Sequence, residues 1–285
     1  MKKKLKILGK IVGAVMALLS VGGMAAGYID RKQNKRRARD AENGNGRFHS
    51  HKPYGIYEAY FKRPFDFICG MLAVIVFWPL YLVIAFMVRI KLGSPVLFTQ
   101  ERPGLNEKIF KLYKFRTMTD ERDENGELLP DEVRLTKFGK WLRSTSLDEL
   151  PEAFNIINGT LSTVGPRPQL VRDMVFMTDE QRMRHTVKPG LSGLAQINGR
   201  NGISWEEKLD WDLKYIEKIT FFGDTKIIID TVKKAFIKQE GISQDDMATA
   251  EDFGDYLLRT GEVSRKEYES KQEEAREILS KGKIL

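Results

Sequence analysis

The chain has 285 residues, 42% hydrophobic and 30% charged, a composition typical of folded proteins that excludes a wholly disordered or collagen-like chain. A single cysteine, Cys69, excludes an intrachain disulfide framework and any zinc site built from several thiolates. The net charge of +8 comes from residues 1–40, which hold eleven Lys and Arg against two Asp. Because this basic arm flanks an apolar run, we expect a membrane partner and no nucleic acid partner.

The first apolar run covers residues 11–29. As a helix, its 19 residues would span roughly 28 Å, close to the roughly 30 Å of a bilayer's hydrocarbon core. The lysines before it also fit a cleaved signal peptide. The basic cluster at 31–39 opposes translocation of the chain that follows, which favours an uncleaved anchor with the following domain in the cytoplasm. The spacing of Gly23 and Gly27 is a weak indication of helix pairing.

The second apolar run covers residues 67–88, twenty-two uncharged residues with Pro79 in the middle. Basic residues flank it on both sides, namely Lys62, Arg63, Arg89 and Lys91. The positive-inside rule draws both ends to the cytoplasmic face, which a straight span cannot satisfy. A helix broken at Pro79, over about 65–90, can enter and leave on one side. A kinked spanning helix is the alternative.

The remainder is typical of a globular domain. Short aromatic and β-branched runs predict strands at 96–100 and 108–118. Apolar periodicity predicts helices at 150–158, 204–219, 224–239 and 264–280, the second opened by a capping box of Ser204 and Glu207. We therefore expect a helix-rich, mixed α/β, membrane-associated domain with a Pro-broken re-entrant helix, preceded by a hydrophobic anchor. The expected organisation is a basic arm with the anchor (1–40), a linker (41–59), a folded domain (60–243) and a charged, partly helical tail (244–285).

Asp148 and Glu149 form an acidic pair in the segment RSTSLDELPEAF, just before a predicted helix. A structural role is the simpler interpretation, because Ser146 with Glu149 fits a capping box and carboxylates favour helix N-termini. A chemical role would require a carboxylate held against a metal and an electrophile such as phosphorus.

Several cations accompany this pair. Arg167 lies between Pro166 and Pro168, which stiffen the turn that carries it, and a guanidinium held in this way can bind phosphate in bidentate fashion. The other candidates are Lys114, Arg143 and Arg200. Each alone is typical of a solvated surface charge. Together, beside a membrane segment, they indicate a phosphate-bearing substrate at the bilayer face.

At this point the residues resemble a known family, the bacterial sugar transferases, which are monotopic polyprenyl-phosphate phosphoglycosyl transferases. The resemblance covers about 60–243 and is closer to the small members than to the large polytopic ones. Trp78 precedes Pro79 where similar members often carry Ser. The matching segments are KRPFDFICGML, SPVLFTQERPG, FKLYKFRTM, LRSTSLDELPEAFNIINGTLSTVGPRP and KPGLSGLAQINGRNGISW.

The resemblance implies an enzyme of the bacterial inner membrane that faces the cytoplasm. It would transfer a sugar 1-phosphate from a UDP-sugar to polyprenyl phosphate, release UMP and use Mg²⁺, in the first membrane step of glycoconjugate assembly. The resemblance further implies that Asp148 is the nucleophile and that Glu149 binds magnesium. Arg167 and Arg200 would face the nucleotide or its phosphates, with Lys114 and Arg143 close by.

Two other interpretations stay open. The chain could be a non-catalytic membrane scaffold that recruits glycan enzymes. Alternatively, transfer could be direct, within a ternary complex in which Asp148 is a metal ligand. A homodimer is possible, and no motif identifies the sugar or its pathway.

Overall fold

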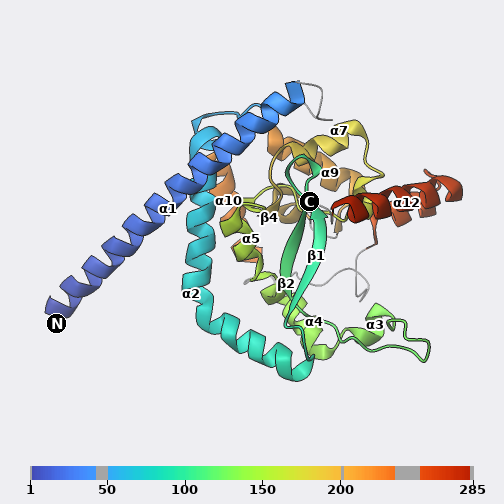
Figure 1. Ribbon diagram of the computed structural model, residues 1–285, viewed down its shortest axis with the longest axis horizontal. Helices are drawn as coiled ribbons and strands as arrows, with labels where there is room; N and C mark the ends of the chain where they lie inside the picture. The colour runs from blue at the N-terminus through green and yellow to red at the C-terminus, as the bar shows by residue number, and fades with distance from the viewer. Residues whose placement is uncertain (1, 43–50, 200–201, 235–250, 283–285) are drawn as a thin grey trace.

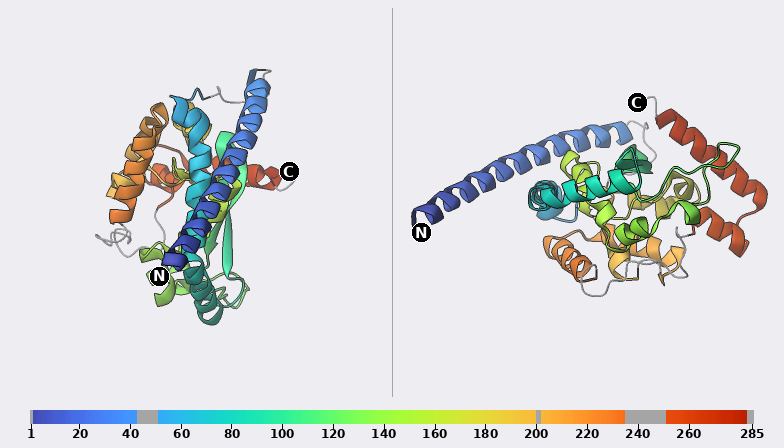
Figure 2. Two further views of the ribbon diagram at one scale, coloured as in Figure 1. Left: turned by 90° about the vertical axis from the view of Figure 1, so that its left-hand side faces the viewer. Right: turned by 90° about the horizontal axis from the view of Figure 1, so that it is seen from below.

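Two long helices lie to one side of a group of short helices and two small sheets (Figure 1). The computed structural model describes residues 2–42, 51–199, 202–234 and 251–282. The expected helix-rich, mixed α/β fold class is confirmed. Helix α1 extends away from the body of the molecule, and α12 lies at the opposite end (Figures 1 and 2).

The described residues form mostly short helices and four short strands. In chain order they are α1 (Lys2–Glu42), η1 (Tyr57–Phe61), α2 (Lys62–Lys91), β1 (Leu97–Pro103), η2 (Leu105–Glu107), β2 (Ile109–Phe115), α3 (Asp131–Arg134), α4 (Lys137–Ser144), η3 (Leu147–Glu149), α5 (Glu152–Asn158), β3 (Ser162–Val164), α6 (Val171–Met174), α7 (Asp179–Arg182), η4 (Met183–Thr186), β4 (Gly190–Ser192), α8 (Leu194–Ile197), α9 (Trp205–Glu217), α10 (Phe221–Lys233), α11 (Phe253–Thr260) and α12 (Arg265–Gly282).

Two described segments, Gly13–Gln33 and Tyr57–Lys91, are helical, long and apolar enough to cross a membrane. Few of their side chains are buried inside the protein. Pro79 lies inside α2, which hydrogen-bonds as one helix and visibly changes direction along its length (Figure 1). The proline ring removes one backbone donor and crowds the preceding turn, which is the usual cause of such a bend. The helix is therefore bent rather than interrupted, and re-entry into the membrane stays a prediction.

Helix α1 packs against the first half of α2 through glycines. A Cβ on Gly23 would lie 3.2 Å from the backbone oxygen of Pro64, and one on Gly27 would lie 3.0 Å from a Pro64 ring carbon. A Cβ on Gly22 would lie 2.7 Å from the Phe67 ring. Because these positions lack side chains, the two helices approach closely, as small residues allow in membrane helix pairs. Gly23 and Gly27 therefore do mark a helix pair, and the partner is α2.

Buried ion pairs and hydrogen bonds fix the start of α2 to the body of the protein. The Lys62 ammonium group donates to Asp224 of α10 at 2.7 Å. The Asp66 carboxylate, 2% exposed, accepts from the Ser162 hydroxyl at 2.8 Å and from the Thr163 amide at 2.9 Å. Strand β3 is thereby held against α2, just before the turn that carries Pro166 and Pro168.

Strands β1 and β2 form an antiparallel hairpin with a register from Leu97 opposite Phe115 to Pro103 opposite Ile109. The predicted strands are confirmed, with β1 three residues longer at its end than expected. Leu112 packs with Ile156 and Leu161 on one face of the hairpin. Side chains alternate along a strand, so Lys114 lies on this same face, towards α5.

The predicted helices are found with small changes at their ends. Ser204 and Glu207 form the expected capping box at the start of α9, and α12 corresponds to the helix predicted at 264–280. Helix α10 starts three residues early because Thr220 caps it, and the final part of the predicted 224–239 helix lies outside the described residues. The helix predicted at 150–158 begins two residues later, after a separate turn of 3-10 helix.

Candidate active site

The acidic pair lies on η3, a single turn between α4 and α5. Ser146, just before it, adopts a left-handed conformation (φ 55°), which non-glycine residues rarely occupy. In this conformation the Ser146 side chain makes no capping hydrogen bond, so the expected capping box with Glu149 is wrong. The Glu149 carboxylate instead binds two cations. The turn thus presents both acids to the interior of the protein rather than to a helix end.

Asp148 is 7% exposed. Burial, and then the negative charge of Glu149, raise the pKa of Asp148 to about 6, against the opposing charges of Lys114, Arg143 and Arg167. Among the described residues, none donates a hydrogen bond to the Asp148 carboxylate. At neutral pH this carboxylate is mostly ionised, and no described residue donates a hydrogen bond to its oxygens, a state suited to nucleophilic attack.

Glu149 has the opposite electrostatic environment. Its Oε1 accepts a hydrogen bond from the Lys114 ammonium group at 2.8 Å and from Arg167 Nη2 at 2.7 Å. Burial alone would raise the pKa of Glu149, but the charges of Arg167 and Lys114 outweigh burial and hold the pKa well below its usual range. Neighbouring carboxylates with pKa values displaced in opposite directions are typical of catalytic sites.

Glu152, at the start of α5, is a third acid in this cluster that was not predicted from the sequence. Its carboxylate lies 3.3 Å from the Lys114 ammonium group and is 3% exposed. Burial and the charge of Glu149 raise the pKa of Glu152 to about 7. The three-residue spacing from Glu149 was the available signal, since residues three apart share a helix face.

Arg167 reaches this cluster from the turn formed by residues 166–168, here called the PRP turn. Its backbone oxygen accepts a hydrogen bond from Arg184 Nη2 at 2.5 Å, and the Pro168 oxygen accepts one from Arg102 Nη1 at 3.2 Å. Arg184 is 1% exposed and pairs with the Asp212 carboxylate of α9 at 2.6 Å. Buried guanidinium groups therefore fix the backbone of the turn and leave the Arg167 side chain, 40% exposed, directed at Glu149.

The other predicted residues are distributed as follows. Arg143, in the last turn of α4, donates to the Thr117 hydroxyl at 3.1 Å and contributes positive charge at Asp148. Arg200 lies outside the described residues. Pro79 lies on α2 rather than in the acidic cluster. The structure thus brings together Lys114, Asp148, Glu149 and Arg167, with Arg143 close to Asp148.

Helix α2 reaches the acidic cluster with its second half. Ile84 and Val88, both fully buried, pack with Leu142 of α4 and against Leu147 and Leu150, which flank the acidic pair. The Tyr81 hydroxyl donates to the Leu150 backbone oxygen at 2.5 Å. The candidate site is therefore attached directly to the bent apolar helix.

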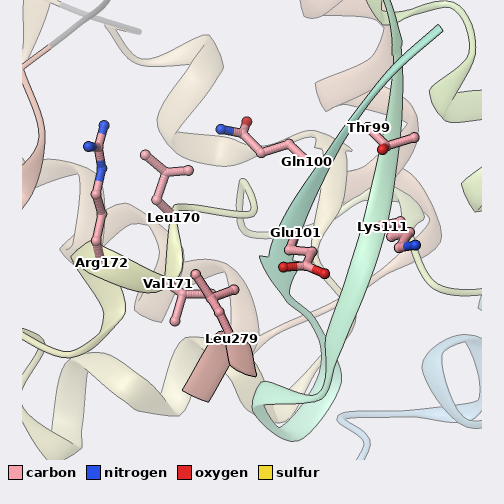
Figure 3. A pocket seen from close by; sticks show the side chains of 8 residues that line it. All are labelled: Thr99, Gln100, Glu101, Lys111, Leu170, Val171, Arg172 and Leu279. Carbon is pink, nitrogen blue, oxygen red and sulfur yellow. The ribbon is translucent and has the colours of Figure 1, made fainter. Parts of the chain in front are cut away.

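A cavity of about 430 Å³ lies elsewhere, between the hairpin, α6 and α12 (Figure 3). Lys111, which lines it, is three residues from Lys114 on β2, so the two side chains point to opposite faces of the hairpin. None of the predicted site residues lines this cavity. The chemistry indicated by the acidic cluster is on the other face.

The residues present fit a magnesium ion. Mg²⁺ prefers carboxylate oxygens and usually binds one or two of them, completing its shell with substrate phosphates and water. The described residues contain no group of three or more His, Cys, Asp or Glu side chains able to hold a metal. The Glu149 carboxylate, whose pKa is held low, would supply one ligand of the smaller, phosphate-completed type of site.

Buried carboxylates beside fixed cations are typical of an active site for an anionic substrate, and comparisons with known proteins place the chain in a family of enzymes. The family model described as bacterial sugar transferase matches residues 57–238. The sugar transferase EpsL of Bacillus subtilis (strain 168) is 52% identical over 192 residues, which cover 67% of this chain and 95% of EpsL. The chain belongs to the bacterial sugar transferase family and is an enzyme.

Two further relatives have names that describe a substrate or a pathway. UDP-glucose:undecaprenyl-phosphate glucose-1-phosphate transferase of Klebsiella pneumoniae is 42% identical over 189 residues, 63% of this chain and 41% of that enzyme. The exopolysaccharide production protein ExoY of Rhizobium meliloti (strain 1021) is 36% identical over 189 residues, 60% of this chain and 83% of ExoY. The chain thus spans less than half of the larger Klebsiella enzyme and most of the smaller relatives.

Proposed function

We propose that this enzyme transfers a sugar 1-phosphate from a UDP-sugar to polyprenyl phosphate, giving polyprenyl-diphosphate-sugar and UMP. The observation that carries the proposal is the buried Asp148–Glu149 pair, with pKa values displaced in opposite directions beside Lys114 and Arg167. The names of several relatives, which act on undecaprenyl phosphate, support the same reaction class.

In the first half-reaction, an Asp148 carboxylate oxygen attacks the phosphorus that bears the sugar. The phosphoanhydride bond to UMP breaks, and UMP leaves with the bonding electron pair. An aspartyl phosphosugar ester remains on the enzyme. In the second half-reaction, an oxygen of polyprenyl phosphate attacks the same phosphorus and releases the Asp148 carboxylate. No proton is required in either step.

The cations explain how the Asp148 carboxylate can approach a substrate phosphate, although both groups are negatively charged. Negative charge on the transferred phosphoryl group is stabilised by positive groups fixed before the reaction. Lys114 and Arg167 supply that charge, and Arg143 supplies more beside Asp148. Glu149, which stays ionised, would hold Mg²⁺, and the metal would neutralise phosphate charge when bound.

The acceptor is a lipid, so the site must lie at a membrane surface. Helix α2 exposes large apolar side chains along its length and packs beside η3 with its second half. A re-entrant placement of α2, with its basic ends in the cytoplasm, would hold the acidic cluster at the cytoplasmic face, where UDP-sugars are available. A direct transfer, or a non-catalytic scaffold, would leave the raised pKa of the buried Asp148 carboxyl without a role.

The test is turnover by the full chain in nanodiscs, with undecaprenyl phosphate and a panel of UDP-sugars, with and without Mg²⁺. We expect one or more donors to give undecaprenyl-diphosphate-sugar and equimolar UMP, only with the metal, and ping-pong kinetics. Glu273→Gln, on the exposed face of α12 and away from the acidic cluster, should give the same turnover as the native chain. No product from any donor would contradict the proposed reaction, and sequential kinetics would contradict the covalent intermediate.

A further inference from the structure

Residues 251–282, here called the C-terminal extension, follow the segment 57–238 that the family model matches. The extension consists of α11 and α12 and packs onto the body of the protein. Phe253 and Leu257 of α11 pack with Met177, Trp205 and Leu209. The extension is thus a folded part of this enzyme, and its attachment site determines what it can do.

That attachment site is α6, the element directly after the PRP turn. Ala275 of α12, 2% exposed, packs against Val171, Met174 and Val175. Leu279 of α12 extends the same contact, and Figure 3 shows it beside Val171. Helix α6 has only four residues, so its conformation depends on packing rather than on its own hydrogen bonds.

One carboxylate joins the extension to the end of the PRP turn. Asp173, 2% exposed, accepts a hydrogen bond from the Leu170 amide at 3.0 Å and another from the Phe253 amide at 2.9 Å. Leu170 is three residues after Arg167, and Phe253 is the first residue of α11. Arg172 and Asp252 form an ion pair at the same junction.

The opposite end of the PRP turn is fixed from another direction. The Gly165 amide donates to the Ser192 oxygen at 2.8 Å, and the Gly190 amide donates to the Pro166 oxygen at 2.9 Å. A Cβ on Gly165 would lie 2.5 Å from the Lys188 oxygen, so the chain passes closely over the residues just before β4. The start of the turn is therefore held by β4, and its Arg167 and Pro168 oxygens are held by Arg184 and Arg102. The segment that follows the turn, from Leu170 onwards, is held through Asp173 and the extension.

We propose that the C-terminal extension is a positioning element for Arg167: by binding Asp173 and covering α6, it fixes the segment that follows the turn directing Arg167 at Glu149. Among the described residues, no hydrogen bond or ion pair joins the extension to Asp148, Glu149 or Arg167. Because a guanidinium misplaced by about 1 Å can lower a rate by about 100-fold, a remote contact of this kind affects catalysis. The inference rests on the proposed function for its kinetic readout.

The experiment compares the full chain with a chain that ends at residue 250, by amide hydrogen exchange over 166–175 and by kcat and KM for the UDP-sugar. We expect faster exchange at Leu170 and a kcat lower by roughly tenfold or more, with a smaller change in KM. In an Arg167→Lys background, removal of the extension should lower kcat by less than about twofold, because the affected group is already altered.

Two variants keep the test decisive if the shortened chain does not fold. Leu279→Ala and Asp173→Asn retain every residue and should reproduce faster exchange and lower kcat, whereas Glu273→Gln should change neither. Equal losses of kcat in the native and Arg167→Lys backgrounds would overturn the proposal, as would unchanged exchange at Leu170. If the full chain is inactive with every donor, the proposed function fails, and hydrogen exchange alone still decides whether the extension holds the turn.

Discussion

Arg167 Nη2 lies 2.7 Å from Oε1 of Glu149, although the two residues come from different elements and are 18 positions apart. The Lys114 ammonium group lies 2.8 Å from the same oxygen. This arrangement keeps Glu149 ionised and leaves Asp148, its neighbour in sequence, with a raised pKa. Near pH 6, Glu149 is therefore ionised whereas Asp148 is partly protonated.

Asp148→Asn should abolish transfer without harming the fold. Loss of a nucleophile lowers kcat by at least about 10³-fold. The pKa of Asp148 in the folded protein, about 6, exceeds its value in the unfolded chain. At any pH above the unfolded value this carboxyl therefore lowers the free energy of unfolding, by very roughly 1–3 kcal/mol at neutral pH. The neutral amide removes that cost, so the melting temperature should stay equal or rise. An inactive variant that melts well below the native protein would contradict a catalytic role for Asp148.

The first half-reaction should depend on pH through Asp148. The attacking form is the carboxylate, so the rate with UDP-sugar alone should rise with pH through an apparent pKa of about 6. A UDP-sugar has no group of its own that ionises near this pH, so stopped reactions analysed for UMP report on the enzyme. Arg167→Ala removes a positive charge that lowers the pKa of Asp148 and should move the rise to higher pH.

Glu152 provides the control for assigning this pH dependence to Asp148, because burial also places the pKa of Glu152 near neutrality. In Glu152→Gln the rise should persist near pH 6, and its disappearance would mean that Glu152 is the titrating group. A rate independent of pH between 5 and 8 in the native enzyme would contradict both assignments.

Variants at Arg184 and Asp212 should distinguish an effect on the stability of the protein from an effect on its catalytic rate. Arg184→Met leaves the Asp212 carboxylate buried without its partner, which should lower the free energy of unfolding by about 3–5 kcal/mol. The double variant Arg184→Met with Asp212→Leu should recover much of that stability by apolar packing. Its kcat should remain lower by roughly tenfold, because the Arg167 oxygen has lost its donor and the side chain its fixed position. Native activity in a stable double variant would exclude this positioning role.

The contact between α1 and α2 should be sensitive to added volume. Gly27→Leu would introduce a side chain against the Pro64 ring and should destabilise the protein by about 1–3 kcal/mol. Gly13→Leu is the matched control, since nothing lies within 4 Å of a Cβ at that position. Thermal unfolding of both variants in the same detergent provides the measurement, and equal melting temperatures would show that α1 does not depend on this contact.

Local sequence signals predicted the local structure well. Short runs rich in aromatic and β-branched residues located both strands of the hairpin, and the Ser204–Glu207 pair located the start of α9. The segment LDELPEAF was also identified as the centre of the site. Its conformation was not, because Ser146 is left-handed and Glu149 pairs with Lys114 and Arg167 across the fold instead of completing a capping box.

The residues that the sequence analysis missed are buried polar partners. Arg102, Arg184 and Asp212 support the PRP turn from three different elements. Nothing in a single sequence distinguishes such residues from solvated charges, which are far more common. Pairing across the fold is what identifies them.

The most direct test of the account is intact-mass measurement of the purified full chain, incubated with Mg²⁺ and each UDP-sugar in the absence of lipid acceptor. We expect the mass to increase by one sugar phosphate with an accepted donor, the adduct to map to Asp148, and undecaprenyl phosphate to remove it. Asp148→Asn should show no increase. Product formation through an adduct at another residue, or at full rate in Asp148→Asn, would contradict the central claim.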